Sequence, residues 1–124
     1  MEAAAAKSDA LDRLKHAGLA YVTFALRRPE HFTVMFDAPT SRRKHPDSAA
    51  AGEEGFATLL AFVKSCQDAG RLPSGDLRQM ALLAWSMVHG IAKLAITGRL
   101  PFHSNAEVLK FTEFVMAQSL PVDG

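Results

Sequence analysis

The chain has 124 residues, of which 48% are hydrophobic and 22% are charged, and its formal net charge is +1 at pH 7. This composition is typical of one folded domain, excludes a disordered chain and does not favour a general polyanion-binding role. The single cysteine, Cys66, excludes an internal disulfide, and no apolar run reaches the ~18 residues of a membrane span.

Residues 1–7 are rich in alanine and resemble the end of a helix that begins further upstream. They lack the basic start and leucine-rich core of a secretory signal, so we expect a cytoplasmic protein without a membrane anchor. Ser8 has the residue type of an N-cap for a helix that runs to about Arg28. Small, apolar and aromatic residues fall on one face of it: Leu11, Leu14, Gly18, Tyr21 and Ala25. Pro29 ends this helix and can begin a short helix to Phe36, which is apolar almost all round and is therefore expected to be buried.

Residues 37–48 form the clearest predicted loop, because two prolines and a basic run at positions 42–45 lack any apolar period. The basic run could contact nucleic acid, but a solvated loop is the simpler interpretation. A third helix is predicted from Glu53 to Ala69, with Gly70 just after its end. Its apolar side carries Phe56, Leu59, Leu60, Val63 and Cys66.

A fourth helix is predicted from Asp76 to Thr97, ending at Gly98, and a capping box at 104–107 opens a fifth helix to about Ser119. No segment alternates with the period of a strand. The sequence therefore predicts an all-α bundle of about five helices. Its domain should span residues 8–120, between residues 1–7 and a tail at 121–124.

The last two helices carry more apolar surface than one core face needs, and the fourth also contains Gly90, whose cost in a helix is ~1 kcal/mol. Such a glycine is usually retained where another backbone packs closely. We therefore expect a homodimer in which these two helices form a four-helix bundle, although a monomer with two central helices is the alternative. The expected interface residues are Leu83, Ser86, Met87, Gly90, Leu94, Phe111, Phe114 and Val115.

Catalytic chemistry finds little support, because the carboxylates lie mostly at helix starts and in loops, and no histidine or cysteine pair has metal-ligand spacing. We expect no catalytic residue, metal or cofactor. Bulky side chains spread over four helices can instead line an apolar ligand cavity, with His89 as a polar anchor. This candidate set comprises Tyr21, Phe24, Phe32, Met35, Phe36, Phe62, Cys66, Trp85 and His89, and the alternative is that these residues fill an ordinary core.

Two stretches carry a family resemblance. One is Leu11–Phe36, with Arg-Arg-Pro-Glu-His-Phe after a long helix. The other is Leu82–Phe102, with Trp85, His89 and Gly90 followed by Gly-Arg-Leu-Pro-Phe. Together they resemble the C-terminal domain of tetracycline-repressor-like (TetR) transcriptional regulators, in the subgroup named for its Trp-His-Gly signature.

The resemblance implies a dimeric, effector-sensing domain attached to an N-terminal helix-turn-helix that binds operator DNA. The sequence before Ser8 is too short for that helix-turn-helix, so the chain is expected to be a truncated form that does not bind an operator by itself. Two alternatives stay open. One is a haem or redox sensor in which His89 or Cys66 ligates iron, and the other is a dimerisation module without a ligand.

Overall fold

The structure is a computed structural model that describes residues 2–36 and 46–119. Five helices and no strand are present in these ranges, which confirms the predicted all-α fold. The helices are α1 (Glu2–Arg27), α2 (Pro29–Phe36), α4 (Pro46–Asp68), α5 (Leu77–Ile96) and α6 (Asn105–Ser119).

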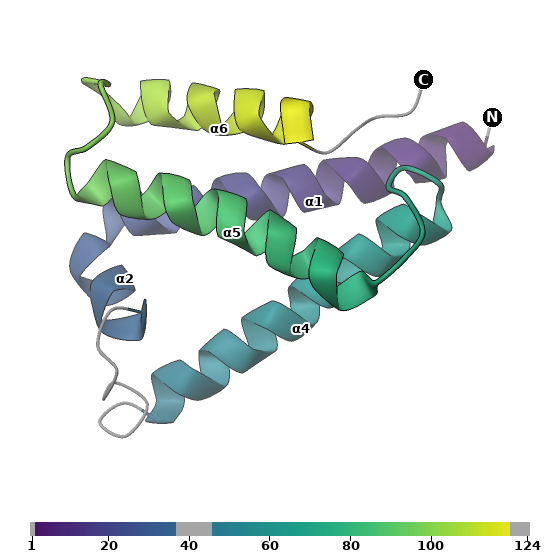
Figure 1. The fold of residues 1–124 in the computed structure, drawn as a ribbon, viewed down its shortest axis with the longest axis horizontal. Coiled ribbons are helices and arrows are strands. Elements are labelled where there is room, and N and C mark those ends of the chain that lie inside the picture. Colours follow the sequence, from purple (N-terminus) through teal and green to yellow (C-terminus); the bar gives the residue numbers. More distant parts are fainter. Residues whose placement is uncertain (1, 37–45, 120–124) are drawn as a thin grey trace.

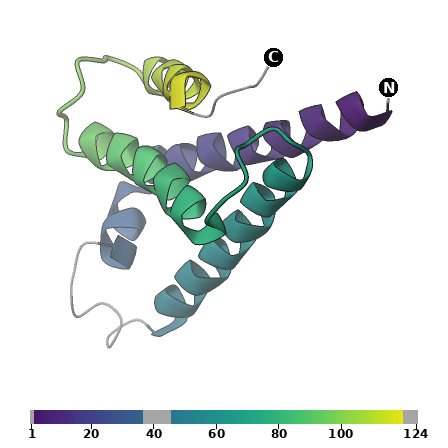
Figure 2. The same ribbon diagram turned by 45° about the vertical axis from the view of Figure 1, so that its right-hand side comes forward.

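Helix α1 is the centre of the fold, because it packs against α2, α4, α5 and α6. Helix α4 leaves α1 at an angle, and α2 lies in the opening between them (Figure 1). Helix α5 lies across α1, and after the loop at 97–104 the chain turns back so that α6 runs along α5. A second view shows the same wedge of α1 and α4 with α2 at its open end (Figure 2).

Local signals define both ends of α5 and the start of α6. Asp76 caps α5, since its carboxylate accepts a hydrogen bond from Gln79 N at 3.0 Å. Gly98 follows the C-cap with φ of 71°, in the left-handed region that favours glycine. Ser104 Oγ accepts from Glu107 N at 3.2 Å, as the predicted capping box requires.

Two predicted helix starts are wrong. Helix α1 begins at Glu2, so Ser8 lies inside the helix and is not its N-cap. Alanine has the highest helix propensity, and nothing in residues 3–6 stops the helix. Helix α4 begins at Pro46 rather than Glu53, because proline is well suited to the first helical position. The predicted basic run at 42–45 lies outside the described residues.

The expected burial of α2 is only partly right. Phe32 is fully buried, whereas Val34 is 41% exposed and Met35 and Phe36 are half-buried. The short helix is therefore attached to the bundle on one side, mainly through Phe32, which packs with Ala25 of α1 and Ala92 of α5.

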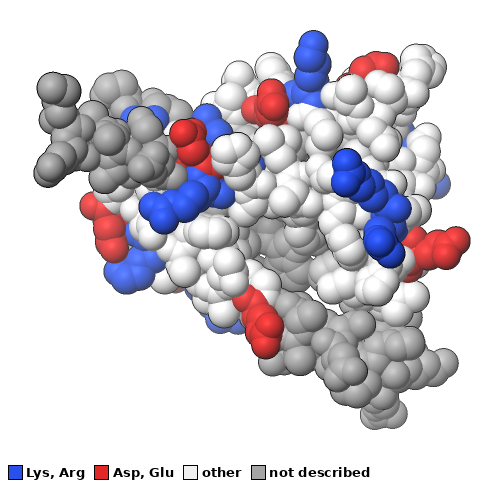
Figure 3. All heavy atoms as spheres, turned by 180° about the vertical axis from the view of Figure 1, so that it is seen from behind, with Lys and Arg blue, Asp and Glu red and all other residues white. Residues whose placement is uncertain are grey.

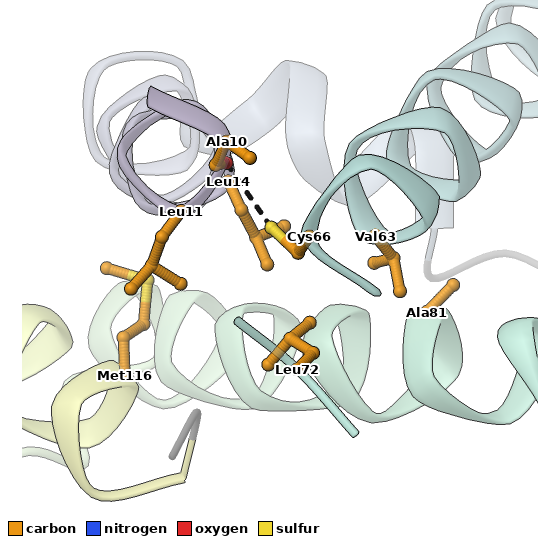
Figure 4. Packing of buried hydrophobic residues seen from close by; sticks show 8 residues of the cluster. All are labelled: Ala10, Leu11, Leu14, Val63, Cys66, Leu72, Ala81 and Met116. Atoms are coloured by element: carbon orange, nitrogen blue, oxygen red, sulfur yellow. Dashed lines mark hydrogen bonds between the residues drawn. The ribbon is translucent and has the colours of Figure 1, made fainter. Parts of the chain in front are cut away.

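The main core lies where α1, α4, α5 and α6 meet (Figure 4). Its buried residues are Ala10, Leu11, Leu14, Val63, Cys66, Leu72, Ala81 and Met116. Met116 reaches it from α6 and points toward Leu11. The same methionine lies against Gly18 of α1, where an added Cβ would come within 2.8 Å of Met116 Sδ and 3.3 Å of Val88 Cγ1. Helix α6 therefore needs glycine at position 18 to pack this closely.

Candidate functional site

A chain of hydrogen bonds joins α1 to α5 at the centre of the protein. Trp85 Nε1 donates to the hydroxyl of Tyr21 at 3.0 Å, and that hydroxyl lies 2.7 Å from His89 Nδ1. Trp85 and His89 are four residues apart on α5 and thus share a face of the helix, as predicted. The tyrosine hydroxyl has a single hydrogen. It donates this hydrogen to His89 Nδ1 when the imidazole carries its own proton on Nε2.

Aromatic rings from α2 enclose the imidazole of His89. The ring centroids of Phe32 and Phe36 lie 5.2 Å and 5.0 Å from that of His89. Tyr21 meets Phe32 edge to face at 5.7 Å, and Phe36 lies 6.1 Å from Trp85. We call these five residues the aromatic cluster. Such ring pairs stabilise the fold by more than their buried area alone would, so the cluster holds α2 against α1 and α5.

Burial has a clear effect on the Tyr21 hydroxyl. The pKa of Tyr21 is raised from 10.0 to about 12. Loss of hydration on burial causes the rise, and the hydrogen bond from Trp85 offsets part of it. The phenol is therefore neutral at physiological pH and can serve as both donor and acceptor in the chain. A neutral phenol held in this way can hydrogen-bond to a neighbouring group and fix its orientation.

Next to the aromatic cluster lies a cavity of about 120 Å³ between α1, α4 and α5, with Met116 of α6 in its wall. Tyr21 and Trp85 belong to both the cluster and the cavity wall. The exposed residues Gly55 and Thr58 of α4 lie where the cavity meets the surface. The described residues that line it are Leu14, Ala17, Gly18, Tyr21, Gly55, Thr58, Leu59, Phe62, Ala84, Trp85, Met87, Val88 and Met116.

The nine residues of the predicted ligand set fall into three groups. Tyr21, Phe62 and Trp85 line the cavity. Phe32, Phe36 and His89 form the rest of the aromatic cluster behind it. The other three belong neither to the cavity wall nor to the five-residue cluster. Phe24 borders the cluster, because it packs with the buried group that contains Phe32 and meets His31 edge to face at 5.8 Å. Met35 is half-buried on α2, and Cys66 lies in the main core.

Cys66 lies among the buried residues of the main core. Its thiol is fully buried and donates to the carbonyl oxygen of Ala10 at 3.3 Å (Figure 4). Burial raises the pKa of the thiol, opposed by the positive charges of Arg13 and Arg71. A protonated thiol in the core is a weak nucleophile and a poor metal ligand. Within the described residues, no three histidine, cysteine or acidic side chains gather as a metal site.

Sequence reasoning missed two residues of the cavity that prove important, Gly18 and Met116. Gly18 was placed on the apolar face of the first helix, but its contact with the last helix could not be foreseen. The available signal was its position, because glycine inside a long helix usually has a packing reason. Met116 carried no such signal, since it is one of several apolar residues in α6.

The predicted interface residues differ in exposure. Leu83 and Leu94 of α5 are 44% and 45% exposed, and Phe114 of α6 is 59% exposed. Ser86 is exposed as well, and Gly90 has open space where a side chain would begin. Within one protomer no close backbone contact to a described residue is made at Gly90, so the contact expected there stays a prediction for the dimer interface. Inside the protomer, Gly18 makes the close contact. Met87, Phe111 and Val115 are half-buried and pack on the protomer's own core.

Helix α5 is also unusually apolar. It is 20 residues long with a window of mean hydropathy 1.3, so by length and composition alone it could cross a membrane. Only 28% of that window is buried in the protomer. Core helices of soluble proteins pass the same test, and α5 packs against α1, α4 and α6.

Among the described residues, charged side chains do not gather into a patch of one sign on the face opposite that of Figure 1. Lysines and arginines are interspersed there with acidic and uncharged residues (Figure 3). This distribution agrees with the net charge of +1, and the described residues of this face form no basic patch of the kind that binds nucleic acid.

Residues 14–118 match the family described as tetracyclin repressor-like, C-terminal domain. The chain belongs to this family. The match spans the cavity, the aromatic cluster and the outer faces of α5 and α6. Comparison with curated proteins and with solved structures gave no significant match.

Tetracycline-repressor-like C-terminal domains are the regulatory, non-enzymatic halves of transcriptional regulators, and they generally dimerise and bind effectors. The matched range lies inside the predicted domain at 8–120. Membership of the Trp-His-Gly subgroup, suggested by Trp85, His89 and Gly90, stays a prediction.

Proposed function

We propose that this tetracycline-repressor-like domain senses a small apolar molecule in the cavity between α1, α4 and α5, and forms a homodimer through α5 and α6. In an intact regulator with an N-terminal helix-turn-helix, ligand binding would control the affinity for operator DNA. One observation carries the proposal: in a domain of this family, an apolar cavity lies beside the hydrogen-bonded side chains of Tyr21, Trp85 and His89. Ligand sites in helical bundles have this mixture of apolar walls and few polar groups.

The outer surface of α5 supports the homodimer. Leu83 and Leu94 lie exposed on the same helix as the open Gly90, and the helix is long and apolar with little of it buried. An exposed apolar helix face of this kind is usually covered by a partner. A second copy is the natural occupant, since a two-fold axis would pair α5 and α6 with their own equivalents in a four-helix bundle.

We further propose that the effect on DNA is a population shift. Helix α1 supplies Leu14, Gly18 and Tyr21 to the cavity, so a ligand that prefers one position of α1 relative to α5 would favour that arrangement. Coupling free energies between such sites are typically 1–3 kcal/mol. An intact regulator that bound its operator equally well with and without every ligand of this domain would contradict the mechanism.

The arrangement favours an effector site over a haem or redox sensor. Cys66 and His89 lie in different clusters, and His89 Nδ1 is already hydrogen-bonded to Tyr21. The visible absorption spectrum of the purified protein tests this alternative, because bound haem would give a strong absorption band.

Sedimentation tests the dimer. We expect the wild-type domain to sediment as a dimer at micromolar concentration without detergent, and Leu94→Glu to sediment as a folded monomer, because a carboxylate cannot be buried in an apolar interface. Val34→Glu is the matched control, since Val34 is similarly exposed but lies on α2. A wild-type monomer, or equal effects of the two substitutions, would refute the proposed interface. A need for detergent would point to a membrane role for α5 and against the proposed cytoplasmic location.

A further inference from the structure

Among the described residues, none that lines the cavity has a charged side chain. The residues with polar side-chain atoms are Tyr21, Thr58 and Trp85. Thr58 Oγ1 donates to the carbonyl oxygen of Glu54, and Trp85 Nε1 donates to the hydroxyl of Tyr21. An ionised group enclosed by this wall would lose its hydration and gain no opposite charge from the described lining, which is strongly unfavourable.

The volume of the cavity sets a second limit. An apolar protein cavity of about 150 Å³ stays dry and holds one benzene molecule. At about 120 Å³, this cavity is of similar size and slightly smaller. Fused rings or long acyl chains exceed this volume, so they would have to protrude through the opening at Gly55 and Thr58 or push the helices apart.

We propose that the cavity selects neutral, mostly apolar molecules about the size of a single six-membered ring. This inference rests on the proposed function and narrows the class of effector. Acidic aromatic compounds, fatty acids and polycyclic drugs fall outside the class. Selection follows from charge and volume rather than from a specific hydrogen bond.

Two small residues of α1 allow a direct test of the volume. Ala17 lines the cavity, whereas Ala20 lies one turn further along and is exposed to solvent. A phenylalanine at position 17 should fill the space that the ligand needs. The same substitution at position 20 adds equal apolar volume at the surface and serves as the matched control.

Trp85 provides the readout, because it is the only tryptophan and lies in the cavity wall. Bromobenzene carries a heavy atom that quenches the fluorescence of a nearby indole. We expect saturable quenching of the wild type and of Ala20→Phe, and none of Ala17→Phe. Circular dichroism would establish that both variants keep the helical fold.

Competition against bromobenzene then measures selectivity. Toluene should compete, whereas benzoate, of similar size but charged, and naphthalene, neutral but larger, should be weaker by at least about 100-fold. Equal competition by benzoate or naphthalene would overturn the proposed class and leave the effector function standing. Absence of saturable quenching in the wild type would overturn the class too, and a thermal-shift screen with larger apolar compounds would then decide whether the effector function itself survives.

Discussion

At the scale of single residues, Tyr21 holds the site together. Its hydroxyl joins Trp85 and His89 of α5 to α1, while its ring contacts Phe32 and Phe36 of α2. One side chain thus connects three helices with polar and aromatic contacts. The pKa of about 12 has a direct consequence for stability at alkaline pH.

We expect Tyr21 to make stability fall as the pH rises from about 10 to about 12. The folded protein holds the phenolic proton more tightly than the unfolded chain, so the stabilisation is complete below the unfolded pKa and is lost through the folded pKa. Urea unfolding of the wild type and of Tyr21→Phe across this range measures the difference. The difference in free energy of unfolding should shrink with pH, because only the wild type contains the titrating group.

The single tyrosine also permits direct observation of this titration. Near-ultraviolet absorbance reports the phenolate, and its formation in the folded protein should be delayed well beyond pH 10. Phenolate formation near the ordinary pKa of about 10, as in an unfolded chain, would show that Tyr21 is not buried as described.

Residue patterns predicted part of this site. The spacing of Trp85 and His89 correctly placed both on one face of α5, because helical geometry alone determines it. The sequence did not determine which neighbour that face meets. Phe62 and Cys66 illustrate the limit: they are also four residues apart, yet Phe62 lines the cavity and Cys66 packs under Ala10. A small rotation of the helix about its axis decides between the two environments. The hydrophobic period of the sequence does not reveal such a rotation.

At the scale of elements, local chemistry was the most reliable guide. Asp76, Gly98 and Ser104 marked helix ends correctly because each satisfies backbone groups within its own turn. Pro46 was misleading, since the same residue occurs in loops and at the first position of helices. The bundle class was predictable, whereas the contact of α6 with α1 at Gly18 depended on tertiary packing.

The two glycines inside helices should respond differently to the same substitution. Gly18→Leu should lower the free energy of unfolding by about 1–3 kcal/mol, because the new side chain must displace Met116 and Val88. Gly90→Leu should leave protomer stability unchanged or raise it by up to ~1 kcal/mol, because nothing lies within 4 Å and leucine favours helix. Urea unfolding would measure both in the Leu94→Glu background, which removes the second copy. Equal destabilisation by the two would contradict the packing described for Gly18.

At the scale of the whole molecule, the cavity and the proposed dimer surface meet in one helix. Met116 of α6 lines the cavity and packs on Gly18, while Phe114 of the same helix is exposed. A ligand that displaces Met116 therefore acts on an element that a second copy would also contact. Binding of ligand and of partner should be thermodynamically linked.

We expect saturating bromobenzene to change the dimer dissociation constant by roughly 5- to 150-fold, the range typical of such coupling. Reciprocally, the monomeric Leu94→Glu variant should bind bromobenzene with an affinity that differs by the same factor.

Met116→Ala should reduce this factor, because it removes the contact between cavity and α6. Met80→Ala is the matched control, since Met80 packs on the same core without lining the cavity. Sedimentation with and without ligand gives the first quantity, and Trp85 quenching gives the second. Identical ligand affinity of monomer and dimer would show that the cavity is not coupled to the interface through Met116.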